Sequence, residues 1–275
     1  MPWEYLTMMA FELNGGVELE IQTRLRLYDF STSEQVFFEW QAGLLGTLSN
    51  KRVLELGCGD GDLWRYLLPR WSRCDILLTD IDSRILDVAQ RNVSSVAQSD
   101  HHIRYQSLDF NRLSECSESG FDVIIANHNL FYADNLYRLL AEIAVSLNDG
   151  GVLICSTMGA KHLHELQSLL ARYQPKMHWP TGHLASRFGL DNGYQALASL
   201  FGRVDQFEYD NYLNLPSAEP IRVYLQKRLH GADADWLAEH WPELESVIRQ
   251  QIEQKGSYRL TPNAGFFIAR KTSRP

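Results

Sequence analysis

The amino-acid sequence predicts an α/β fold with a doubly wound, mostly parallel sheet of seven strands and a helical cap. Between residues 52 and 156, short apolar runs alternate with helical patterns, and this order implies right-handed crossovers between parallel strands. Most of these runs are almost continuous in Val, Ile and Leu, as expected for strands that are covered on both faces. A later segment, about 214–260, is largely helical in pattern and rich in Trp, Tyr and Leu, which predicts the cap.

The elements of the sheet follow in order along the chain. Five strands are predicted first, at 52–56, 75–79, 103–107, 121–126 and 152–156. Helices are predicted between them, at about 61–68, 83–97 and 134–147. The last of these helices is expected to stop at the run Asn148–Gly151. Two further strands are predicted at 203–210 and 265–270.

Helical patterns precede and follow these strands. Ser33 is expected to cap a helix over about 34–48, which carries an apolar stripe. Four more helices are predicted late in the chain, at 161–173, 191–201, 218–230 and 235–254. We expect one domain over 1–275. Its parts are an N-terminal cover with the first helix (1–50), a core (51–160), and a region (161–275) that includes the cap insertion and the last two strands.

The composition argues against several classes of function. The formal net charge is -8, from 26 Lys and Arg against 34 Asp and Glu, and no basic run is long, so we expect no nucleic-acid partner. The four cysteines are far apart and no cluster has metal-ligand spacing, so we expect reduced thiols and no metal. We expect neither a signal peptide nor a membrane span, which needs ~18 apolar residues. These features predict a soluble, cytoplasmic monomer or homodimer.

One stretch of the sequence carries chemistry: VLELGCGDGDL, residues 53–63. It places a G-x-G-x-G turn directly after a strand and before a helix, where bare backbone and helix N–H groups can face a ligand. Asp62 stands where dinucleotide-binding turns have their third glycine, which disfavours an NAD-dependent oxidoreductase. Glu55 lies two residues before the turn. Asp80 ends the next strand about 20 residues on, where a carboxylate can hold both hydroxyls of a ribose.

These residues resemble the class I S-adenosylmethionine-dependent methyltransferases, whose first motif is acidic-x-Gly-x-Gly-x-Gly. The resemblance continues in order through LLTDID, SLDF, FDVIIANHNLFY and NDGGVLICST, and covers about residues 50–160. It implies a Rossmann-like fold, S-adenosylmethionine as cofactor and a small-molecule substrate, with the helices of 161–275 on the substrate side. It also implies a set of cofactor-binding residues: Glu55, Gly57, Cys58, Gly59, Gly61, Asp80, Ile81, Asp109, Phe110, Asn127 and Arg24.

Several of the implied roles at the adenosine half have an ordinary structural alternative. Asp80 is expected to hold the ribose, or else to cap the next helix. Ile81 would lie beside the adenine ring. Asp109 would accept from the adenine amino group and Phe110 would pack on the ring. Alternatively, Asp109 is a turn residue and Phe110 belongs to the core. Glu55 contacts the loop or the methionine amino group, or simply bonds nearby backbone.

The remaining implied residues concern the methionine half of the cofactor and the acceptor. The backbone carbonyl of Asn127 would bind the amino group, and Arg24 would meet the carboxylate. His128 follows the fourth strand, where the carboxyl ends of parallel strands form the active crevice, and its ordinary pKa suits a general base. Tyr28 is the second candidate catalytic residue, lining the methyl-transfer tunnel. The alternatives are a positioning role for His128, and surface or core positions for Arg24 and Tyr28.

Three functions agree with these motifs. The first, which we favour, is methylation of an O, N or C atom of a small-molecule acceptor. The second is RNA or protein methylation. Methyltransferases of nucleobase amino groups usually carry an Asn/Asp-Pro-Pro-aromatic loop after the fourth strand, but this chain has Asn127-His128-Asn129-Leu130 there. The third is a non-catalytic module that binds the cofactor and transfers nothing.

Overall fold

The computed structural model describes residues 27–97, 100–175, 177 and 180–272. These residues form two compact units. The first, here called the sheet unit, comprises the described residues of 35–162, 179–210 and 263–275. The second, here called the helical unit, comprises those of 1–34, 163–178 and 211–262. The division into two units does not test whether residues 1–275 form a single domain, so that expectation stays a prediction.

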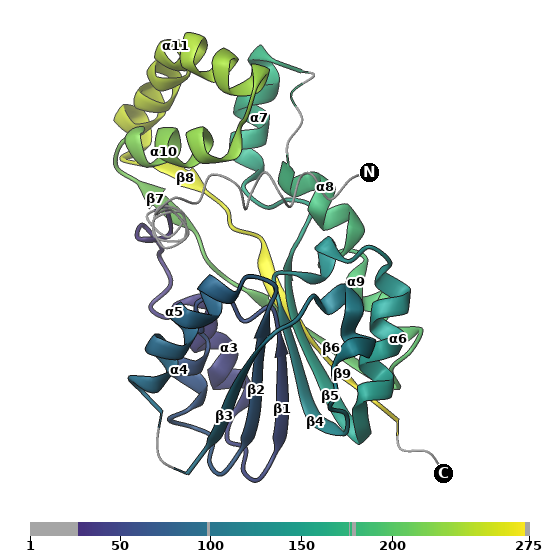
Figure 1. Ribbon diagram of the computed structural model, residues 1–275. Helices are drawn as coiled ribbons and strands as arrows, with labels where there is room; N and C mark the ends of the chain where they lie inside the picture. The colour runs from purple at the N-terminus through teal and green to yellow at the C-terminus, as the bar shows by residue number, and fades with distance from the viewer. Residues whose placement is uncertain (1–26, 98–99, 176, 178–179, 273–275) are drawn as a thin grey trace. The chain divides into compact units, whose positions relative to one another are not determined.

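The described part of the sheet unit is built on a seven-stranded sheet in the order β3-β2-β1-β4-β5-β9-β6 (Figure 1). Strand β9 pairs antiparallel with β5 and β6, and the other pairs are parallel. The strands are β1 (Arg52–Leu56), β2 (Asp75–Asp80), β3 (His102–Ser107), β4 (Phe121–Asn127), β5 (Leu147–Met158), β6 (Arg203–Tyr209) and β9 (Ala264–Arg270). This arrangement confirms the predicted doubly wound, mostly parallel α/β fold.

Apolar side chains alternate between the two faces of the sheet, and helices bury both faces. Leu54 and Ile124 belong to one core cluster, whereas their strand neighbours Val53 and Val123 belong to the other. The Val53 side is covered by α3 (Phe37–Leu45), α4 (Trp64–Leu67) and α5 (Ser83–Ser94). The opposite side is covered by α6 (Leu136–Ser146), α8 (Pro180–Arg187) and α9 (Gly193–Ala198), with the 3₁₀ helices η1 (Phe110–Glu115) and η2 (Leu130–Tyr132). Because β1 pairs parallel with both β2 and β4, the carboxyl ends of these three strands lie at one edge of the sheet.

Some element boundaries differ from the prediction. The chain passes from α6 directly into β5 at Leu147, so the run Asn148–Gly151 lies inside that strand instead of ending the helix. A shift of register between β4 and β5 accommodates the extra residues. Ser33 does not cap the first helix, whose N-cap is Val36 without a side-chain hydrogen bond. Helix α4 is shorter than expected because the left-handed backbone of the glycine-rich turn runs up to residue 61.

Among its described residues, the helical unit contains α7 (His164–Tyr173), α10 (Glu219–Arg228), α11 (Ala232–Lys255), β7 (Leu213–Leu215) and β8 (Tyr258–Leu260). Strands β7 and β8 pair antiparallel, and α7 and α11 pack against β8. The Glu165 carboxylate accepts from the Thr261 N–H at 3.0 Å, which ties α7 to the end of β8. The pattern predicted these helices but missed the two strands, because three residues carry no periodicity. No helix within the described ranges is long and apolar enough to cross a membrane.

Candidate active site

The glycine-rich turn leaves the carboxyl end of β1 in left-handed backbone. Gly57, Gly59 and Gly61 have φ of +67°, +55° and +78°, a region that favours glycine. A Cβ added at Gly59 would meet no atom within 4 Å, so this backbone borders open space. The Gly59 N–H donates to Asp80 Oδ2 at 3.0 Å. The turn therefore presents bare backbone beside a carboxylate.

Asp80 ends β2 with its carboxylate against this turn. The N–H of Asp82 donates to Asp80 Oδ1 at 3.1 Å. Burial raises the pKa of Asp80, and the backbone hydrogen bonds partly offset this effect. The cap of α5 is Asp82, whose side chain accepts from the Arg84 N–H, so helix capping does not account for Asp80. The two oxygens of Asp80 accept these backbone bonds, and a carboxylate has about four acceptor sites, so it can also accept from a hydroxyl donor.

Glu55 lies on β1 inside the sheet unit, with 2% of its surface exposed. Trp64 Nε1, from α4, donates to its carboxylate. Burial raises the pKa of Glu55 to about 8; the Trp64 bond lowers this pKa, and the charges of Asp80 and Asp60 raise it. The carboxyl group is therefore largely protonated at neutral pH, and it accepts a hydrogen bond from the Trp64 side chain. Its expected contact with the methionine amino group stays a prediction.

The loops after β2 and β3 carry the residues predicted to lie at the adenine ring. Ile81 is 66% exposed, so it offers an apolar surface outside the core. The Asp109 carboxylate accepts from the Asn111 N–H at 2.9 Å and caps η1, while Phe110 is half-buried against the core cluster. These contacts fit the structural alternatives, and the adenine roles remain predictions. Within the turn itself, burial raises the pKa of the Cys58 thiol, which keeps it unreactive.

The segment after β4 makes a strained turn at the same edge. His128 has a φ of +52°, which is costly for a residue with a Cβ. Its N–H donates to the carbonyl oxygen and Oγ of Ser156 on β5, at 3.0 and 3.1 Å. The His128 ring centroid lies 5.1 Å from that of Phe37. Burial lowers the pKa of His128 to about 4, so the imidazole is neutral at physiological pH and can accept a proton.

Two side chains that sequence reasoning missed hold this region. Gln41, fully buried on α3, donates from Nε2 to Asn127 Oδ1 at 3.0 Å, and Asn127 Nδ2 donates back to Gln41 Oε1 at 3.2 Å. Asn129 Nδ2 donates to the Leu56 carbonyl, and a Cβ added at Gly57 would come within 2.6 Å of that nitrogen. These partners lie 86 and 73 positions apart in the chain. No local sequence signal reveals such pairs.

The site described above does not include two of the predicted residues. Arg24 falls outside the described residues. Tyr28 is half-buried and belongs to the helical unit. Its place in the methyl-transfer tunnel stays a prediction. Within the part of the chain that the structure describes, no group of three or more His, Cys, Asp or Glu residues is arranged to hold a metal ion.

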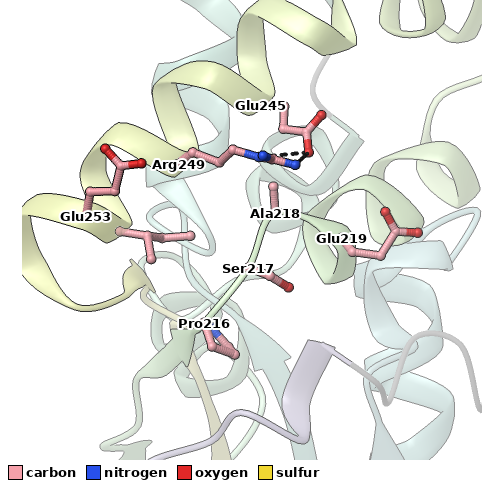
Figure 2. A pocket seen from close by; sticks show the side chains of 8 residues that line it. Pro216, Ser217, Ala218, Glu219, Glu245, Arg249 and Glu253 are labelled. Atoms are coloured by element: carbon pink, nitrogen blue, oxygen red, sulfur yellow. Dashed lines mark hydrogen bonds and ion pairs between the residues drawn. The ribbon is translucent and has the colours of Figure 1, made fainter.

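Pockets are present in both units. Figure 2 shows one of about 400 Å³ in the helical unit, between the segment 216–219 and α11. Arg249 bonds Glu245 at 2.6 Å on one wall, and Glu219 and Glu253 complete its charged lining. Three carboxylates against one guanidinium disfavour an anionic ligand there. A pocket of about 330 Å³ in the sheet unit lies among η2, α6, α8 and α9.

The glycine-rich turn and its neighbouring strands match a known family. Residues 54–153 fit the family model described as a methyltransferase domain. The chain is 29% identical over 203 residues to a malonyl-[acyl-carrier protein] O-methyltransferase of Enterobacter lignolyticus. The aligned region covers 74% of this chain and 72% of that protein. Residues 54–153 therefore form a methyltransferase domain of the class I S-adenosylmethionine-dependent kind. S-adenosylmethionine is the cofactor of that class.

Other relatives align with shorter parts of this methyltransferase. An uncharacterized protein of Haemophilus influenzae is 30% identical over 137 residues, which is 50% of this chain and 54% of that protein. The methyltransferase spans about half the length, or slightly less, of most curated relatives it matches. The crystal structure of a candidate methyltransferase from Bacillus halodurans has a TM-score of 0.57 at 13% identity, and covers 86% of this chain and 99% of that chain. This likeness shows a shared fold.

The residues at the methyltransferase's carboxyl edge fit the cofactor chemically. The open backbone at Gly59 leaves room for a ligand, and Asp80 keeps lone pairs beside it for two neighbouring hydroxyls. Ile81, next in sequence, offers an exposed apolar surface for a base. The side chain of Asn127 already bonds Gln41, and the contact of its backbone carbonyl with the methionine amino group stays a prediction. This set of groups suits a nucleoside with an amino-acid tail.

Proposed function

We propose that this methyltransferase transfers the methyl group of S-adenosylmethionine to an O, N or C atom of a small-molecule acceptor. The observation that carries the proposal is the contact between Gly59 and Asp80. It brings bare backbone and a half-buried carboxylate together at the carboxyl ends of β1 and β2, the edge where ligands bind in parallel α/β sheets. We further propose that the protein acts as a monomer or homodimer without a nucleic-acid partner.

The chain's own residues bind the cofactor, orient the acceptor and accept a proton. When bound, the cofactor supplies an electrophilic methyl group on a sulfonium. In the proposed mechanism, Asp80 accepts from the ribose hydroxyls and the Asn127 carbonyl accepts from the amino group. His128, neutral because its pKa is about 4, accepts the proton that a hydroxyl or amine acceptor loses. The site must also hold the acceptor atom in line with the methyl group and exclude water.

A carboxylate is the acceptor class that this site favours in our proposal. An imidazole with a pKa of about 4 is a weak base, so His128 suits a reaction that does not depend on a strong one. A carboxylate is already ionised at neutral pH and attacks without losing a proton. Several relatives of the chain are named malonyl-[acyl-carrier protein] O-methyltransferases, which supports the same choice.

Methyl transfer from isotopically labelled cofactor to a panel of acceptors tests the proposal. The panel pairs a malonyl thioester with an alcohol and an amine of similar size, and mass spectrometry identifies the product. We expect a methyl ester of the carboxylate, formed together with S-adenosylhomocysteine. If the protein binds the cofactor but methylates no member of the panel, the carboxylate assignment is wrong. The same outcome with a broad metabolite extract favours a module that only binds the cofactor.

A further inference from the structure

The buried Gln41 side chain of α3 bonds the side chain of Asn127, where the turn that follows β4 begins. The carboxamides of Gln41 and Asn127 each donate to and accept from the other. Phe37 lies four residues before Gln41 on the same helix and contacts the ring of His128. Residues four apart share one face of a helix, so α3 presents a single platform to two consecutive residues of the turn.

Gln41 and Phe37 contact a turn whose backbone is strained at His128. The φ of His128 is in the left-handed region, which persists for a residue with a Cβ only where its surroundings fix it. Ser156 fixes the turn from β5, by accepting the His128 N–H. Gln41 fixes it from α3, through Asn127. The turn is therefore held from β5, from α3 and, through the bond of Asn129 to the Leu56 carbonyl, from β1.

We infer that Gln41 is a positioning residue for the cofactor, because it orients the Asn127–His128 peptide through the Asn127 side chain. This inference rests on the proposed function, since it takes that edge of the sheet as the cofactor site. An apolar residue in place of Gln41 leaves the half-buried Asn127 carboxamide without these hydrogen bonds, which favours rearrangement of the turn. Rearrangement moves the Asn127 carbonyl, the group proposed to meet the cofactor.

A double-mutant cycle on cofactor affinity tests the inference. The Kd of S-adenosylhomocysteine is measured by calorimetry for wild type, Gln41→Leu, Asn127→Ala and the double variant. We expect Gln41→Leu to raise the Kd about tenfold in the wild-type background. In the Asn127→Ala background it changes the Kd less than about twofold, because the group through which Gln41 acts is absent. Equal weakening in both backgrounds, or no weakening in either, overturns the inference.

Tyr209→Phe is the matched control for a purely structural role of α3. The Tyr209 hydroxyl donates to the Gln35 carbonyl just before α3, so the variant loses an anchor of the same segment without touching Asn127. We expect this variant to lower the midpoint of thermal unfolding and to leave the Kd unchanged. If Tyr209→Phe weakens binding as much as Gln41→Leu does, the effect belongs to the stability of α3 and the inference is wrong.

Gln41→Glu supplies a second readout, the pH dependence of binding. A protonated carboxyl group offers one donor and one acceptor, as the amide does, whereas a carboxylate offers no donor to Asn127 Oδ1. Relative to wild type, binding by Gln41→Glu is expected to recover as the pH falls toward ~5. A pH-independent ratio contradicts the inference. Failure of the wild type to bind S-adenosylhomocysteine overturns both this role and the proposed function, whereas normal binding by Gln41→Leu overturns this role alone.

Discussion

Replacing Glu55 by Gln should remove a large pH dependence of stability. Glu55 is 2% exposed, and burial is the main reason that its pKa is raised from 4.5 to about 8. Trp64 Nε1 donates a hydrogen bond to its side chain, and an amide oxygen can accept that bond equally well. The substitution therefore removes the titration while keeping the shape and the hydrogen bond of the side chain.

The sign and size follow from linkage between proton binding and folding. In the unfolded chain Glu55 loses its proton near pH 4.5, whereas in the folded protein it keeps the proton up to about pH 8. The folded state therefore binds more protons in this window, and the free energy of unfolding falls as the pH rises through it. At about 1.4 kcal/mol per pH unit, the full window corresponds to about 5 kcal/mol. Below about pH 4.5 and above about pH 8, Glu55 adds no further pH dependence to the free energy of unfolding.

Urea unfolding of wild type and Glu55→Gln at intervals between about pH 5 and pH 8 measures this effect. The gap between the two curves should change by several kcal/mol across the window, with the variant gaining relative stability as the pH rises. Glu118→Gln is the control, because Arg104 beside it lowers the pKa of Glu118, and its contribution is instead lost as the pH falls. Parallel curves for wild type and Glu55→Gln would refute the reasoning.

Two further predictions concern the turns at the carboxyl edge. Gly57→Ala should destabilise the protein by about 2–3 kcal/mol, against about 1 kcal/mol for Gly256→Ala, in urea unfolding. Both glycines have a positive φ, +67° and +82°, but a Cβ added at Gly256 would meet no atom within 4 Å, whereas one at Gly57 would approach Asn129 Nδ2; equal losses would mean that this contact is not tight. If the panel identifies a hydroxyl or amine acceptor instead of the carboxylate, His128→Ala should lower kcat for it by about 10²-fold or more, with an unchanged Kd for the cofactor. A nearly normal rate would leave His128 a positioning role only.

The sheet could be predicted because its signals are local. Each central strand is a short apolar run, and the order of strands and helices dictates parallel pairing. The glycine-rich turn and Asp80 are equally local, since each follows directly on a predicted strand. The contact between Gly59 and Asp80 then follows from topology, because β1 and β2 are neighbours in the sheet.

The missing parts depend on tertiary contacts. Gln41 looks like an ordinary polar residue in the pattern of the first helix, and only the fold reveals that it meets Asn127. Asn129 belongs to the loop after the fourth predicted strand, but its bond to the Leu56 carbonyl needs β1 and β4 to lie side by side. The run Asn148–Gly151 has the pattern of a helix stop, because a bulged strand start uses the same turn-forming residues.

Calorimetric titration of S-adenosylhomocysteine into wild type, Asp80→Ala and Asp75→Asn tests the central claim most directly. Asp75 lies at the opposite end of β2 and pairs with Arg104, so it serves as a control for damage to the strand. Loss of the hydrogen bonds that the ribose hydroxyls donate to Asp80 should weaken binding by roughly 1–3 kcal/mol, whereas Asp75→Asn should bind like the wild type. Wild-type affinity in Asp80→Ala would contradict the placement of the cofactor at this edge.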